Sequence, residues 1–195
     1  MTEAVSIRRA LLLHILASSA AVYIVLLRTV DDSYLSHREH WGYMLLALAS
    51  GGVQAALLVG RCAMVDWWVR RNNPAPSRRR AFLHRHAELA AGAVLAAVVG
   101  GILVYDGFWM LDESYPRPAF PALLDMLWFL GYVVGGIGVL VYIVLACQQI
   151  GQIYNISRKR RAAALAIGFL PEFGFYGLAV AAWVSFLIVY GPSLA

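Results

Sequence analysis

The sequence predicts an all-α protein, a polytopic membrane bundle of five transmembrane helices in a single domain that covers residues 1–195. Composition is the first observation behind this prediction. Hydrophobic residues make up 61% of the chain and charged residues 14%, whereas a soluble domain is about half apolar and a quarter charged. The second observation is that the apolar residues are grouped into long runs. The connections between runs reach only about fifteen residues, too few for a soluble domain with its own core.

The apolar runs are the predicted spans. Each is near or above the roughly 20 residues that a helix rising 1.5 Å per residue needs to cross about 30 Å of hydrocarbon. In order along the chain they cover roughly residues 10–28, 41–69, 86–109, 121–148 and 162–190. The first run continues without a break through residue 27, which favours an uncleaved span over a signal peptide. Glu88 and Asp125 open the third and fourth spans, where an acid complements the positive end of the helix dipole.

The sign of the charge alternates from one connection to the next. Most of the 16 Lys and Arg residues lie before the first run, between the second and third, or between the fourth and fifth, and the other connections are acidic or nearly neutral. Because basic residues stay on the cytoplasmic side, this pattern predicts a cytoplasmic N-terminus and an external C-terminus. Arginine outnumbers lysine fifteen to one, which indicates a GC-rich bacterial genome, so we expect the bacterial cytoplasmic (inner) membrane.

Three consecutive arginines, Arg78, Arg79 and Arg80, stand in the basic connection between the second and third spans. Beside a membrane, such a cluster is an orientation signal and a contact for anionic lipid headgroups, at about 1 kcal/mol per residue. We therefore expect these arginines to contact the lipid bilayer and not a nucleic acid.

Glu172 is the strongest candidate for an intramembrane functional residue. It lies eleven residues beyond Arg161, about 16 Å along the fifth span, where an ionisable side chain costs several kcal/mol unless it is paired or neutral. Pro171 precedes it and predicts a kink. We expect the carboxyl to be neutral unless a cation lies near. We expect it to serve either as a proton, ion or quinone site or as a structural hydrogen bond. One face of this span is predicted to point inward. It carries Gly168, Glu172, Tyr176, Ala179 and Trp183.

Two polar residues of the second span are placed relative to Glu172. Gln54 lies thirteen residues from Trp41, about 20 Å into the span, so it shares a level with Glu172 and is a candidate partner for it. Arg61 follows on the same face, close to the cytoplasmic boundary. We expect its guanidinium to snorkel to that boundary.

Histidines support a redox hypothesis. His14 lies five residues past Arg9, about 7 Å from the inner boundary, and His86 stands at the cytoplasmic start of the third span. Two imidazoles at one depth on neighbouring helices are the axial ligands that a six-coordinate haem b requires. The alternative for His86 is a solvated histidine at an arginine-rich boundary.

A second pair, His37 and His40, lies in the first external segment. Three-residue spacing puts both rings on one helical face if the second span starts early, and imidazole with carboxylate suits copper or zinc. An ordinary hydrated loop explains the same residues. The neighbouring carboxylates are Asp31, Asp32 and Glu39.

The sequence contains no phosphate-binding loop, nucleophile elbow, zinc-protease helix or dinucleotide fingerprint, which favours a non-enzymatic role. Small residues on helix faces allow close approach of other helices, within the chain, between copies of it, or between different subunits. They are Gly92, Ala96 and Gly100 on the third span and Gly131, Gly135 and Gly138 on the fourth. The leading hypothesis is a subunit or scaffold of a membrane complex. The alternatives are a redox protein that binds haem b or quinone, and a proton- or ion-linked permease that uses Glu172.

Overall fold

The structure is a computed structural model that describes the backbone of residues 2–29, 37–74, 76–112 and 121–190. Side chains are described for residues 6–24, 40–74, 76–97 and 136–186. Within the described backbone every element is a helix, and the connections between helices are short. The prediction of an all-α fold is confirmed over these residues.

The helices follow the predicted spans closely. In chain order they are α1 (Thr2–Thr29), α2 (His37–Asn72), α3 (Arg79–Asp112), α4 (Pro121–Tyr154), α5 (Arg158–Gly168) and α6 (Leu170–Tyr190). The fifth predicted span is divided into α5 and α6 by an interruption at Phe169, just before the proline at which the sequence predicts a kink. Among the described side chains, four segments are long and apolar enough to cross a membrane: Ser6–Ile24, His40–Asn72, Gly136–Tyr154 and Arg158–Phe186.

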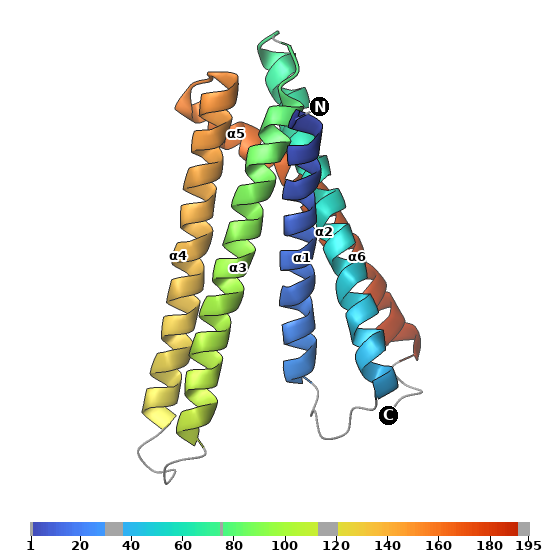
Figure 1. Cartoon of the computed structure of the whole chain (residues 1–195), viewed down its shortest axis with the longest axis vertical. Coiled ribbons are helices and arrows are strands. Elements are labelled where there is room, and N and C mark those ends of the chain that lie inside the picture. The colour runs from blue at the N-terminus through green and yellow to red at the C-terminus, as the bar shows by residue number, and fades with distance from the viewer. Residues whose placement is uncertain (1, 30–36, 75, 113–120, 191–195) are drawn as a thin grey trace.

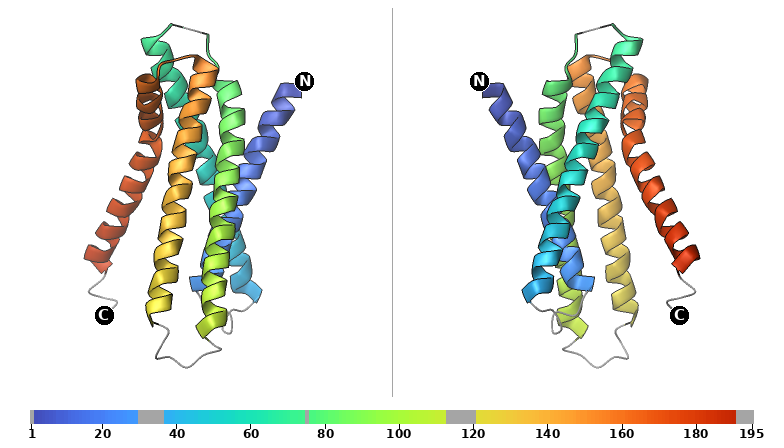
Figure 2. Two further views of the ribbon diagram at one scale, coloured as in Figure 1. Left: turned by 90° about the vertical axis from the view of Figure 1, so that its left-hand side faces the viewer. Right: turned by 90° about the vertical axis from the view of Figure 1, so that its right-hand side faces the viewer.

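The helices form two groups that meet at one end of the bundle and diverge toward the other (Figure 1). In the first group α3 lies beside α4. In the second, α1 and α6 pack on α2, while α1 also packs on α3 and thereby joins the groups. At the end where the groups meet, α5 crosses between α4 and α2. In the two side views α6 leans away from α4 (Figure 2).

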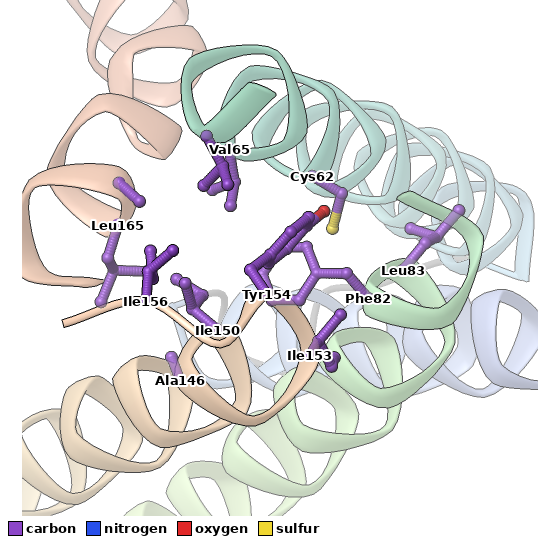
Figure 3. Close-up of a cluster of buried hydrophobic side chains, with 12 residues drawn as sticks. Cys62, Val65, Phe82, Leu83, Ala146, Ile150, Ile153, Tyr154, Ile156 and Leu165 are labelled. Carbon is purple, nitrogen blue, oxygen red and sulfur yellow. The ribbon is translucent and has the colours of Figure 1, made fainter. Parts of the chain in front are cut away.

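We call the end where the groups meet the basic end, because α2 ends there with Arg70 and Arg71, α3 begins with Arg79, and α5 begins with Arg158. The main apolar core lies at this end. Figure 3 shows side chains from α2, α3, α4 and α5 converging on one point. The cluster comprises Cys62, Val65, Val69, Phe82, Leu83, Ala146, Ile150, Ile153, Tyr154, Ile156, Ala164 and Leu165.

A buried carboxylate, that of Asp66, accepts hydrogen bonds from several segments at the basic end. Asp66 on α2 is 5% exposed and accepts hydrogen bonds from the Ser77 hydroxyl at 2.8 Å and the Tyr154 hydroxyl at 2.9 Å. It also accepts one from the backbone N–H of Arg78 at 3.1 Å. A buried charge needs such partners to offset its lost hydration. Asp66 therefore joins the end of α2, the start of α3 and the end of α4, although the sequence analysis did not single it out.

Two arginines bind carbonyl groups at the end of α4 and in the connection that follows it. Arg78 donates to the Ile153 carbonyl at 2.6 Å, and Arg161 donates to the Ile156 carbonyl at 2.7 Å. Cations are favourable at a helix C-terminus, whose last carbonyls lack intrahelical partners. Asn155 supports the turn by adopting a φ of 50°, a left-handed conformation that asparagine tolerates better than most residues.

Close packing of α1 on α2 depends on one glycine. A Cβ atom at Gly51 would lie 2.1 Å from the Ser19 hydroxyl oxygen and 2.7 Å from the Ile15 carbonyl oxygen of α1. The predicted small-residue face of α3 behaves differently, because Gly92 and Ala96 are exposed and a Cβ at Gly92 would meet nothing within 4 Å. Of the possibilities open for this face, packing within the chain does not apply to these two residues. Small residues surround most of α3, so they do not specify which way the helix is rotated.

We predict that Gly51→Ala lowers the free energy of unfolding in detergent by about 2 kcal/mol, because the added methyl group forces α1 away from α2. Gly52→Ala is the matched control, since a Cβ there would meet nothing within 4 Å. Denaturant titration followed by circular dichroism measures both. Equal stability of the two variants would contradict the close contact.

Candidate functional site

Arg61 is the centre of a buried polar network. Its side chain, on α2, is 13% exposed, and both its Nε and Nη2 atoms donate to Oε1 of Glu172 on α6, at 2.8 Å and 2.6 Å. The guanidinium also lies over the Phe169 ring, 4.1 Å from its centroid, at the interruption between α5 and α6. An ion pair and a cation–π contact therefore hold the start of α6 against α2.

The remaining nitrogen of the guanidinium, Nη1, contacts side chains of α4 and α3. Arg61 Nη1 donates to the Tyr142 hydroxyl, which lies 3.0 Å from Nε2 of His86, and Nη1 itself lies 3.4 Å from the same nitrogen. Because a guanidinium can only donate, Nε2 must accept, and the neutral imidazole carries its proton on Nδ1. His86 is completely buried and stacks on Phe82, with ring centroids 4.9 Å apart.

A second polar contact joins α2 to α6 further from the basic end. The Gln54 amide donates to the Tyr176 hydroxyl at 2.6 Å. Gln54 precedes Arg61 by about two helical turns, and Tyr176 follows Glu172 by about one, so the two contacts lie on facing stripes. The α2–α6 interface is thus polar at two levels inside an apolar bundle.

The network borders a cavity of about 280 Å³ between α1, α2, α3 and α4, which is partly open to the surroundings of the bundle. Its polar lining comes from His14, Gln54, Arg61 and Tyr142. The apolar lining consists of Leu58, Ala90, Ala93, Val94, Ala97, Gly138 and Val139. Its volume lies near the lower end of ligand pockets, which measure roughly 300–1,000 Å³.

Three buried polar atoms of this region find no hydrogen-bond partner among the described residues: His14 Nδ1, His86 Nδ1 and Glu172 Oε2. His14 is the informative case, since it is 6% exposed and also lines the cavity. A buried polar atom without a partner costs about 1–3 kcal/mol.

The structure brings Glu172 and Tyr176 close to Gln54 and Arg61, but with different pairings from those expected. Arg61 pairs with Glu172, so the prediction that it snorkels to the boundary is wrong. A carboxylate at 2.6 Å compensates the charge of the guanidinium inside the bundle. Arg61 is therefore the cation that lies near Glu172. Gln54, expected beside Glu172, contacts Tyr176 instead.

The predicted inward stripe of α6 is correct only in its first half. Gly168 and Glu172 are buried, whereas Tyr176 is 46% exposed and Trp183 is 63% exposed. The physical reason is visible in Figure 2, where α6 leans away from the rest of the bundle beyond its first turns. Tyr176 still contacts Gln54 of α2, and beyond it the described side chains of that stripe face the surroundings.

His14 and His86, the candidate haem ligands, lie in one polar region but in different surroundings. His14 lines the cavity, whereas His86 is not among the lining residues and its Nε2 already accepts from Tyr142. The helices that carry them pack directly through Ala10 and Ala87, both fully buried. A haem with both histidines as axial ligands therefore requires α1 and α3 to separate from this packing.

The remaining predicted sites lie on α2 and α4. His37 begins α2 and His40 lies in its first turn, but the His37 side chain is outside the described residues. Among the side chains that are described, no three His, Cys, Asp or Glu residues gather to hold a metal ion. Asp125 lies in α4, with its side chain also outside the described residues.

The arginines predicted to meet lipid headgroups all lie at the basic end with exposed side chains. They are not equivalent. Arg78 commits one nitrogen to the Ile153 carbonyl and so helps to cap α4, whereas Arg79 and Arg80 belong to the first turn of α3.

Tyr142 is the site residue that sequence reasoning missed. It stands in an apolar run of α4 with no polar neighbour nearby in sequence, so nothing distinguishes it from a tyrosine that faces lipid. Its role follows from the contact with Arg61, 81 positions away in the chain.

Comparisons with known proteins give no assignment. The chain matches no protein-family model, no curated protein and no solved structure.

We predict strong coupling between Arg61 and Glu172 in a double-mutant cycle. Arg61→Met and Glu172→Leu each lower the free energy of unfolding in detergent by about 3 kcal/mol, because each leaves a buried charge or carboxyl without its partner. The double variant recovers most of that loss. Additive effects, with the double variant losing about 6 kcal/mol, would contradict a direct pairing.

Proposed function

We propose that this protein binds a small lipid-soluble molecule inside a bundle that spans the bacterial cytoplasmic membrane. The observation that carries the proposal is the cavity between α1, α2, α3 and α4, whose lining combines apolar side chains with the polar groups of His14, Gln54, Arg61 and Tyr142. Its lining is mostly apolar with a few convergent polar groups, as in small-molecule sites generally. Its position among apolar helices favours a ligand that enters from the lipid.

The ligand-binding role explains features that a scaffold does not need. Helix association in lipid requires only close packing of apolar and small residues. A buried arginine with a carboxylate partner is costly in the membrane and is retained mainly where it serves a site. The exposed apolar surfaces of α4 and α6 remain compatible with a partner subunit, but lipid chains cover such surfaces equally well.

Glu172 is better explained as a partner of Arg61 than as the carrier of a permease. It is absent from the cavity lining, and its Oε1 atom receives both donors of the guanidinium. Its effect on a ligand is exerted through Arg61, which does line the cavity. This arrangement favours a binding protein over a proton- or ion-linked permease.

We predict that one apolar molecule per chain accompanies the protein through purification in lipid nanodiscs. Gly138→Leu, which fills the cavity, should lower its amount at least tenfold. Gly136→Leu is the matched control, because it lies on the same helix outside the lining, and neither glycine has an atom within 4 Å of an added Cβ. Solvent extraction with mass spectrometry measures the bound molecule. Finding no molecule above bulk lipid, or equal amounts in both variants, would contradict the proposal.

The proposed orientation places the basic end in the cytoplasm. The helix ends that carry the arginines gather at one end of the bundle, and α6 ends at the opposite one (Figure 1). Basic segments are retained on the cytoplasmic side during insertion.

We predict that a reporter enzyme active only outside the cytoplasm is active when fused after Tyr190 and inactive when inserted after Asn155, between α4 and α5. Protein levels measured by immunoblot serve as the control for expression. The reverse pattern of activity would contradict the orientation.

A further inference from the structure

We infer that the ligand of this cavity is a quinone, bound by its ring with the carbonyl oxygens toward His14 and Arg61. The inference rests on the proposed ligand-binding function and adds the chemical class of the ligand. It draws on three properties of the cavity: its net charge, its hydrogen-bonding groups and the shape of its apolar wall.

The first property is the charge that a ligand meets. Arg61 is the cation of the lining, and its charge is compensated by Glu172 at 2.6 Å. A carboxylate or phosphate ligand would bring a second anion beside Glu172, and a cationic ligand would meet the guanidinium. In a low-dielectric interior either arrangement is costly. A neutral head group is therefore favoured.

The second property is the surplus of hydrogen-bond donors. A guanidinium has five N–H groups. Glu172 takes the two N–H groups on Nε and Nη2, and Tyr142 and the His86 nitrogen face Nη1, so the second N–H on Nη2 remains free of these partners. Gln54 gives one amide N–H to Tyr176 and retains another. These groups suit a ligand that offers hydrogen-bond acceptors, as carbonyl oxygens do.

His14 supplies a hydrogen-bonding group from a second helix. It comes from α1, whereas Arg61 comes from α2, and both side chains line the cavity. A neutral imidazole can donate from either nitrogen, depending on its tautomer. Two donors from different helices can each meet one of the two carbonyl oxygens of a quinone. A purely hydrocarbon ligand would leave both without a partner.

The third property is the shape of the apolar wall. The residues contributed by α3 and α4 are mostly small, with Ala90, Ala93, Ala97 and Gly138 among them. Small side chains give a surface of low relief, against which a flat ring packs well. The volume of about 280 Å³ admits a single head group but not two acyl chains. The isoprenoid tail would leave through the open side of the cavity into lipid.

The test is a titration of the full-length protein in nanodiscs with a short-chain ubiquinone and with menadione, followed by isothermal calorimetry. We expect saturable binding of one quinone per chain. Gly138→Leu should weaken binding at least tenfold, and Gly136→Leu should leave it unchanged. His14→Leu should weaken it about tenfold, the effect of losing one hydrogen bond of about 1.4 kcal/mol.

Competition separates the inference from the function on which it rests. Oleate and phosphatidylglycerol are added as anionic competitors, and neither should displace the quinone. If no quinone binds, or if Gly138→Leu binds it as the parent does, the quinone assignment is overturned. If extraction then yields a fatty acid or another lipid in stoichiometric amount, the ligand-binding function stands with a different ligand. If extraction also yields nothing, both are overturned. Circular dichroism of each variant confirms that it is folded.

Discussion

The interior of this bundle is organised by one buried guanidinium. Arg61 makes polar contacts with side chains of three other helices, since Glu172 lies on α6, Tyr142 on α4 and His86 on α3. An arginine in an apolar surrounding must have its charge compensated and its donors occupied. That requirement determines where α6 leaves α5 and how α4 faces α2. Arg61 also supplies part of the polar lining of the cavity.

Two further constraints position the helices around this centre. At the basic end, Asp66 and the apolar cluster of Figure 3 join α2, α3, α4 and α5. Further along, Gly51 lets α1 approach α2 closely. Beyond these contacts the two groups of helices diverge (Figure 1), and the cavity lies between the anchored end and the divergent one. An anchored end with an adjoining opening suits a ligand whose head is held by protein and whose tail extends into lipid.

Sequence reasoning recovered the spans because composition and run length determine them almost alone. The interruption of the last span also followed from Pro171. The partner of Glu172 did not follow, because helical periodicity does not reveal how α2 and α6 are rotated toward each other, and Arg61 lies 111 positions away. For the same reason the sequence did not reveal the contact between Tyr142 and Arg61. Asp66 stands among apolar residues just before the end of its helix, where an acid four positions before Arg70 has an ordinary explanation as a surface pair.

The central claim is that Arg61 and Glu172 form an ion pair within the membrane, and solid-state NMR of the protein in bilayers tests it directly. With guanidinium nitrogen and glutamate carboxyl carbon labelled, a distance measurement reports the pair and the carboxyl chemical shift reports its ionisation. The account predicts a direct nitrogen-to-carboxyl contact and the shift of an ionised carboxylate at neutral pH. A protonated carboxyl shift with no dipolar contact between the two side chains would contradict it.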